Sequence, residues 1–237
     1  MQYLLTILIL CFALPLKAQW TSFELENIDQ ENLEQQIEPL VKTISLSSSR
    51  HFIAPTDKNK RIGIGVSYSY GINITDNNYS SELIEGYPNL AGNLVITDNL
   101  LLKGNISLFK SDKDIIQSYA YGFGLNLTNK ENNNWRFSVL FSKLHGPDDL
   151  RNRSIDAVVI KEFKIGTVPL FMGVGLNTYK TRLLFTDMES VPNSIKGNAH
   201  NILFGSQITR GRIIIIPAWQ VNTNVIVMSI EILGAFK

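Results

Sequence analysis

The sequence predicts an all-β protein: a transmembrane antiparallel β-barrel of about ten strands, with a short amphipathic helix before the first strand. Two observations predict this fold class. After residue 60, apolar side chains alternate with small or polar ones, the pattern of a strand with one face toward lipid and one toward a lumen. Most alternating segments also reach the roughly 9 to 11 residues that a tilted strand needs to cross a bilayer.

The N-terminus has the pattern of a cleaved signal peptide over residues 1–18, although its first three residues carry no Lys or Arg. The run from Leu4 to Leu14 is apolar except for Thr6, and it is followed by Pro15, Leu16, Lys17 and Ala18. This run is shorter than the roughly 20 residues of a membrane-spanning helix, so an uncleaved anchor is the weaker alternative. The remaining chain divides into a helix and loop at 19–60 and a barrel at 61–237.

Cys11, the only cysteine, lies inside this predicted signal peptide. Cleavage after Ala18 therefore leaves a chain with neither a disulfide nor a thiol active site. Leu10 stands where attachment of a lipid to Cys11 would need a small residue.

A helical pattern precedes the barrel between Asp29, a suitable N-cap, and about Ile44. Pro39 should kink this helix or begin a second one, because proline is tolerated only in a first turn. We expect Ser45 to Lys60 to form a loop. The apolar positions of the helix are Leu33, Ile37, Leu40, Val41 and Ile44.

The period then changes to two, and the alternation is cleanest from Ile62 to Ile74, where large apolar residues alternate with Gly, Ser and Asn. The same reading, applied along the chain, predicts strands at 61–74, 87–97, 99–109, 116–128, 134–144, 154–165, 168–180, 198–209, 212–219 and 223–236.

The connections between these strands alternate in length. Short turns are predicted at 98, 129–133, 166–167 and 210–211, and long polar loops at 75–86, 110–115, 145–153 and 184–197; only 220–222 is short on the long-loop side. Bacterial barrels have an even strand number, short periplasmic turns and longer external loops, so both chain ends are expected in the periplasm.

The last strand carries Ile226, Met228, Ile230, Ile232, Gly234 and Phe236 on one face. A final strand that ends in an aromatic residue resembles that of Gram-negative outer-membrane β-barrel proteins, although Lys237 follows Phe236 here. The resemblance implies the cell outer membrane, recognition by the barrel-assembly machinery through this strand, and contact with outer-membrane lipid and lipopolysaccharide. The helix ahead of the barrel is also similar, in organisation only, to fatty-acid-type outer-membrane transporters, which have an N-terminal hatch but more strands. A soluble β-sandwich is the structural alternative, which the strand lengths oppose.

The composition predicts no enzyme and no cofactor or metal site. The net charge of +1 gives no basic field for nucleic acid. Three histidines are present, and only His145, with Asp148 or Asp149 nearby, suggests a hydrolase site at the membrane surface; an ordinary solvated turn is the simpler interpretation.

Ionisable residues that face the lumen are the candidate site, because a charge in a narrow pore must pair, meet water or touch a solute. Their signs balance, which favours paired bridges over a selectivity ring. Lys161 is expected to face lipid, near the interface or at a bulge. The lumen candidates are Lys103, Arg136, Asp156, Glu162, Arg212 and Glu231.

The leading hypothesis is a small, monomeric channel or carrier for hydrophobic or small polar solutes, with the N-terminal segment gating the periplasmic side. The small residues of the first and fourth strands leave room in the lumen for water, a solute or that segment, unless opposite walls pack together. The alternative is a non-conducting barrel with a structural or surface-interaction role, and the minor alternative is a surface lipid hydrolase.

Overall fold

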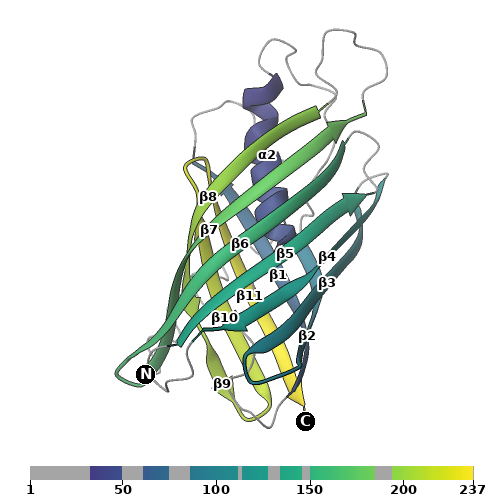
Figure 1. The fold of residues 1–237 in the computed structure, drawn as a ribbon. Coiled ribbons are helices and arrows are strands. Elements are labelled where there is room, and N and C mark those ends of the chain that lie inside the picture. Colours follow the sequence, from purple (N-terminus) through teal and green to yellow (C-terminus); the bar gives the residue numbers. More distant parts are fainter. Residues whose placement is uncertain are drawn as a thin grey trace.

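The computed structural model is a closed antiparallel barrel with one helix inside it (Figure 1). It describes residues 33–49, 61–74, 86–111, 114–127, 134–145, 150–184 and 194–236. The predicted signal peptide at 1–18 and the predicted N-cap Asp29 lie outside the described residues.

The wall contains eleven strand segments in sequence order around the barrel, and β10 and β1 both pair with β11, which closes the sheet. The segments are β1 (Ile62–Asn73), β2 (Tyr87–Val95), β3 (Leu100–Ser111), β4 (Asp114–Asn126), β5 (Asn134–His145), β6 (Leu150–Ile165), β7 (Val168–Leu183), β8 (Ser194–Ser206), β9 (Ile208–Arg210), β10 (Ile213–Val221) and β11 (Val225–Phe236).

Segments β8 and β9 are two parts of one strand, so the barrel has ten strands, as predicted. Both parts pair with β10 in the same register: Ala218 pairs with Gly205, and Ile215 pairs with Ile208. Pro217, which has no N–H to donate to the ladder, lies in β10 between these two pairs.

The direction of the side chains identifies the membrane-facing surface. Large apolar residues point outward, and Ile64 and Leu90 remain 61% and 64% exposed, whereas their neighbours Gly63 and Ala91 face inward and are buried. A soluble sandwich would bury its large apolar residues between two sheets. Here they form the outer surface of a closed barrel, so the fold is that of an outer-membrane β-barrel.

The two ends of the barrel differ. We call the end where β1 begins and β11 finishes the turn end. Its turns include Gly166–Thr167 and Gly211–Arg212, in which both glycines adopt a positive φ that other residues rarely adopt. We call the opposite end the loop end.

Most of the predicted strands are close to the observed ones, but the loop-end boundaries differ. Strands β6, β7 and β8 extend three to four residues further toward the loop end than predicted. The predicted loop at 110–115 is wrong, because Ser111 of β3 already pairs with Asp114 of β4. Polar residues at these strand ends are typical of loops, but the hydrogen-bonded pairing of the strands continues through them.

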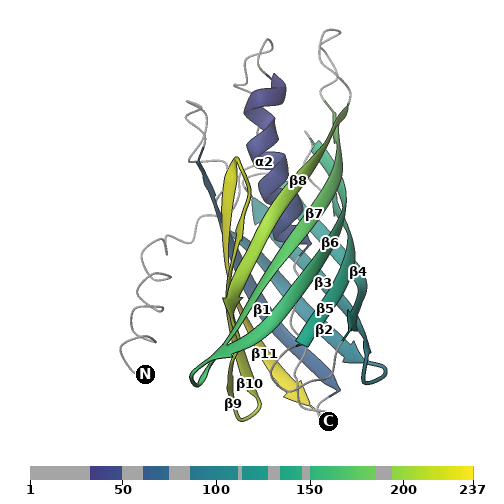
Figure 2. The same cartoon turned by 60° about the vertical axis from the view of Figure 1, so that its left-hand side comes forward.

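Helix α2 (Leu33–Ser48) lies inside the barrel and contacts strands on opposite sides of the wall, including β11, β1, β6 and β7 (Figures 1 and 2). It occupies the half next to the loop end, and its C-terminal residues point toward the middle of the lumen. No helix among the described residues is long and apolar enough to cross a membrane.

Three expectations about this segment are corrected. The helix continues through Ser45 to Ser48, where a loop was predicted, and Pro39 lies inside it rather than at the start of a second helix. The helix also occupies the loop-end half of the lumen, not the end that was expected to face the periplasm.

Candidate functional site: a lumen closed by a helix

Helix α2 is held at the loop end by an apolar cluster. Leu40, Val41 and Ile44 are almost completely buried. They pack against the inward-facing side chains Phe109, Ile116, Leu144, Leu150, Tyr179, Leu183, Ile195 and Ala199, which come from six neighbouring strand segments. Burial of each large aliphatic side chain contributes about 1.5 to 3 kcal/mol, so these contacts hold the helix against the barrel wall.

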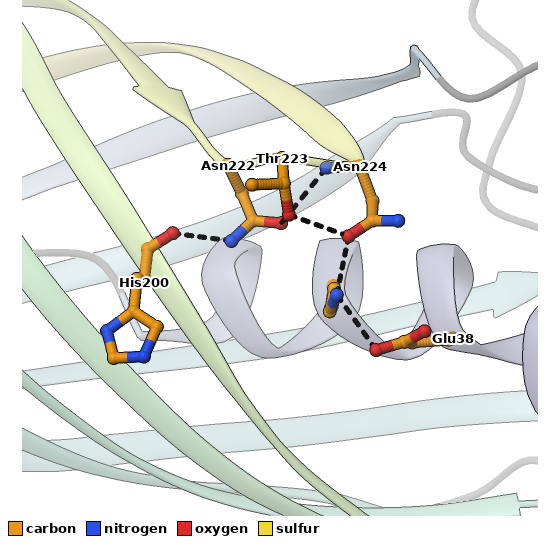
Figure 3. A network of polar contacts seen from close by, with 6 residues as sticks. Glu38, His200, Asn222, Thr223 and Asn224 are labelled. Atoms are coloured by element: carbon orange, nitrogen blue, oxygen red, sulfur yellow. Dashed lines mark hydrogen bonds and ion pairs between the residues drawn. The ribbon is translucent and has the colours of Figure 1, made fainter.

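A polar network connects the same helix to the connection between β10 and β11 (Figure 3). Lys42 donates to Oδ1 of Asn224 and forms an ion pair of 2.9 Å with Glu38, one turn earlier. Asn222 donates from its side chain to the backbone carbonyl of His200 in β8, and its Oδ1 accepts from the backbone N–H of Asn224. The helix is therefore anchored to a hairpin that belongs to the closing strands of the wall.

The C-terminal end of the helix is bound through small hydroxyl groups. Oγ of Ser49 lies 3.1 Å from Oγ of Ser142 and 3.0 Å from Oγ of Ser154, and these two wall hydroxyls lie 2.6 Å from each other. Oγ of Ser48 also lies 3.0 Å from Ser142. We call Ser48, Ser49, Ser142 and Ser154 the serine contact.

Three wall asparagines complete the polar interface. Asn152 donates to Oγ of Ser45 at 2.8 Å, and Asn105 donates to the backbone carbonyl of Ser48 at 3.1 Å. Asn177 donates to Asp156 at 2.8 Å and lies 3.4 Å from the carbonyl of Ser45. Asn105 thus pairs one of the carbonyls that a helix end leaves without an intrahelical partner. Asn152 instead binds a side-chain hydroxyl, and the carbonyl of Ser45 also accepts from the backbone N–H of Ser49.

Below the helix, toward the turn end, the structure brings together four of the six lumen candidates. Arg136 and Glu162 form an ion pair of 2.9 Å between β5 and β6. Lys103 is buried on β3 within electrostatic reach of both residues and of Glu231 on β11. We call these four residues the charged lumen cluster; it contains two cations and two carboxylates.

This half of the lumen has a polar and an apolar side. Beside the charged lumen cluster lies a buried apolar cluster of inward-facing side chains: Ala91, Val158, Ile160, Phe171, Leu203, Ile214, Ile216, Ala218, Leu233 and Ala235. The ammonium group of Lys103 has no hydrogen-bond partner among the described residues, and neither do the side-chain amides of Asn89, Asn93 and Asn201. Buried polar groups are normally satisfied by protein or by ordered water. The polar groups next to the charged lumen cluster are therefore suited to bind water or a small polar solute.

The other two candidates lie elsewhere. Asp156 faces inward but lies under the helix, where it accepts from Asn177. Arg212 does not face the lumen, so this prediction is wrong: it is exposed in the turn between β9 and β10. The predicted strand began at residue 212, and this placed a turn residue on the inner face.

The glycine-lined walls of β1 and β4 are filled by neighbouring side chains. A methyl group at Gly63 would lie 2.6 Å from Oδ1 of Asn93, and one at Gly124 would lie 3.2 Å from Cε of Lys103. These glycines thus give space to the polar side chains of the adjacent strand.

Lys161, expected to face lipid, lies near the turn end of β6, with its Nζ 5.4 Å from the centre of the Trp135 ring. The register between β5 and β6 is continuous, so no bulge is present there. This placement next to an aromatic residue fits the interfacial alternative that the sequence left open.

The described residues contain no group of three or more His, Cys, Asp or Glu side chains arranged to hold a metal ion. His145 is the last residue of β5 and stacks on Tyr119 with ring centres 6.5 Å apart. Its proposed partners Asp148 and Asp149 lie outside the described residues, so the hydrolase hypothesis stays untested.

Sequence reasoning missed the serine contact, because consecutive serines followed by Pro55 and a polar stretch are typical of a loop. A signal was nevertheless present. Inward positions of the predicted strands carry Ser142, Ser154 and Asn177, which are small hydrogen-bonding groups suited to hold a polar segment.

Similarity to known proteins is found at the level of the fold. No protein-family model and no curated protein sequence matches this chain. Among solved structures, the chain is similar to the translocator domain of the autotransporter NalP from Neisseria meningitidis, with a TM-score of 0.50, 7% identity, and 88% of this chain and 96% of that chain covered. An outer-membrane channel from Pseudomonas putida matches with a TM-score of 0.41 and 11% identity over 78% of this chain and all of that one. Ail, the attachment invasion locus protein of Yersinia pestis, matches with a TM-score of 0.29 and 10% identity over 75% and 96%. At these identities the similarity concerns the fold, and this chain has the fold of an outer-membrane β-barrel.

Proposed function

We propose that this protein is an outer-membrane channel for small polar solutes, which helix α2 keeps closed at the loop end. The observation that carries the proposal is the division of the lumen into two halves. The loop-end half is filled by the helix, whereas the turn-end half contains the charged lumen cluster beside an apolar cluster that includes Ile160, Phe171 and Leu233. The charged lumen cluster favours polar over hydrophobic solutes.

The helix has the contacts that a movable plug needs. Its C-terminal end is bound by hydroxyl and amide groups of the wall. Replacing each of these hydrogen bonds with one to water costs only about 1 kcal/mol. The preceding turns of the helix are held by the apolar cluster around Ile44, which keeps the closed state populated. Displacement of the helix would join the charged lumen cluster to the loop end.

Single-channel recording of the refolded protein tests this function. We expect rare opening steps in the wild type and frequent steps when Leu40→Asn and Ile44→Asn weaken the apolar cluster. A disulfide between Ser49→Cys and Ser154→Cys should abolish the steps, and a reductant should restore them. The single variant Ser49→Cys is the matched control. If the double Asn variant is folded and passes no current, the channel hypothesis is wrong.

A second candidate is a non-conducting barrel with a structural or surface-interaction role. The observation in its favour is the Arg136–Glu162 ion pair, which connects two strands below the helix as an internal brace would. Ion selectivity separates the two candidates. In a channel, Lys103→Glu should shift the reversal potential toward cation preference, and a purely structural barrel has no reversal potential to shift.

A further inference from the structure

The outer wall near the loop end carries cations where lipid-facing apolar residues are expected. Lys143, Arg153, Lys180 and Lys196 all point outward from β5, β6, β7 and β8. The strand registers place them side by side: Lys143 pairs with Arg153, Arg153 with Lys180, and Lys180 with Lys196. We call these four residues the basic row.

The basic row is not neutralised by the described part of the protein. None of its members forms an ion pair with a described residue, and the outward positions around it on these strands carry no carboxylate. Arg151 and Arg182 pair with each other in the next row toward the loop end and add two more cations. Like charges directly opposite each other destabilise a sheet, so this arrangement favours the binding of anions.

The basic row borders a groove of about 690 Å³ on the outside of the barrel. Its floor toward the membrane centre is aromatic and aliphatic: Tyr121 and Phe141 stack with ring centres 5.8 Å apart, and Ile155 pairs with Phe141 on the next strand. The groove therefore combines phosphate-binding cations with an apolar surface directly below them.

We propose that this groove binds a phosphorylated glycolipid of the outer leaflet, with its phosphates on the basic row and its acyl chains along Tyr121, Phe141 and Ile155. The apolar outer surface of the barrel keeps these residues in contact with lipid, and longer loops mark the external side of bacterial barrels. A cation next to an anionic lipid surface attracts its headgroups. Lys and Arg side chains can also extend along apolar surface to reach phosphate with their charged ends.

Binding of purified, detergent-solubilised full-length protein to defined lipids tests the proposal, with native mass spectrometry counting bound lipid. The probes are bis-phosphorylated lipid A, the same lipid with both phosphates removed, and inorganic phosphate as competitor. We expect the phosphorylated lipid to bind and the dephosphorylated lipid not to bind. Millimolar inorganic phosphate should not displace it, because the acyl chains contribute to binding.

The test variant carries Lys143→Gln, Arg153→Gln, Lys180→Gln and Lys196→Gln. Each lost cation weakens attraction to an anionic lipid roughly fivefold, so loss of all four should weaken binding about 600-fold. The matched control removes four exposed cations at the turn end, Arg61→Gln, Lys164→Gln, Arg210→Gln and Arg212→Gln, and should bind as the wild type does. A variant with Arg in place of the three lysines of the basic row should retain binding and shows that the site tolerates substitution.

Heat-modifiable migration on a gel verifies that each variant is folded. Three results would overturn the proposal: equal binding of both lipid forms, an equal loss in the turn-end control, or displacement by inorganic phosphate, which would identify a site for free anions. The site lies outside the lumen, so its failure would leave the channel hypothesis unaffected.

Discussion

Arg136 and Glu162 show how two oppositely charged side chains stabilise each other inside the lumen. Both residues face inward on adjacent strands, and their side chains are only 4% and 17% exposed. Asn126 also accepts a hydrogen bond of 2.9 Å from Nε of Arg136. A charge left alone in such a place loses its hydration without compensation, so each member of the pair depends on the other.

The variant Arg136→Met should therefore destabilise the barrel by about 3 kcal/mol, because it leaves the carboxylate of Glu162 unpaired. The double variant Arg136→Met/Glu162→Met should recover most of this loss, since it removes both charges. Urea unfolding in lipid vesicles, followed by tryptophan fluorescence, measures the free energy of unfolding. Lys164→Met, at an exposed position, is the control and should change it by less than about 0.5 kcal/mol. A double variant that is as unstable as the single one would contradict the pairing.

Alternation in the sequence was sufficient to place most individual residues. Lys103, Arg136, Glu162 and Glu231 lie on the inner face because the period of two holds along their strands. Arg212 was misplaced because a turn ends the alternation, and no pattern in the sequence marks the residue at which pairing stops. The basic row was overlooked for a different reason: its members adjoin only through registers that a single sequence does not specify.

At the scale of elements, α2 shows how the surrounding barrel changes the end of a helix that the sequence predicts. The helical period up to Ile44 predicted an amphipathic helix, but serine favours loops and turns when it is isolated in water. In the lumen, wall residues such as Ser142 and Asn152 offer hydrogen bonds that extend the helix to Ser48. The polar half of the interface therefore depends on the closed barrel around it.

Ile44 is one of the buried apolar residues that hold this helix in place. The variant Ile44→Ala should lower the free energy that holds α2 against the wall by about 2 to 4 kcal/mol, because it leaves a cavity in the apolar cluster. Amide hydrogen exchange in α2 should accelerate by about 30-fold or more, while exchange in the strands stays unchanged.

Ile106→Ala is the matched control for this change, because Ile106 faces outward on β3 and is 60% exposed. It should leave exchange in α2 unchanged. If exchange in the strands accelerated together with that in the helix, α2 would be an integral part of the barrel and could not act as a separate plug.

At the scale of the whole molecule, the number and pairing of strands followed from sequence better than the contents of the barrel. Ten strands of membrane-crossing length require the alternation that the chain displays, and closure by β11 on β1 removes both sheet edges. The helix could have lain at either end of the lumen or outside it. Only the wall residues around Phe109 and Leu183, which are far apart in the sequence, select the loop-end half.

The orientation of the barrel in the membrane is the most general expectation that follows from this architecture. The loop end should face outside the cell and the turn end the periplasm, because bacterial barrels place short turns inside. Thr223, in the connection between β10 and β11, and Thr167, in the turn between β6 and β7, are both exposed and lie at opposite ends. Since Cys11 lies in the predicted signal peptide, single cysteines at these positions can be labelled selectively.

In intact cells, a membrane-impermeant maleimide should label Thr223→Cys at once and should label Thr167→Cys only after the outer membrane is permeabilised. Both replacements are of similar size at exposed threonines, so unequal labelling reports accessibility rather than unfolding. The reverse pattern would place α2 and the basic row on the periplasmic side, and the proposed glycolipid site would then face the wrong leaflet. Equal labelling of both before permeabilisation would mean that the barrel does not separate the two compartments as this fold requires.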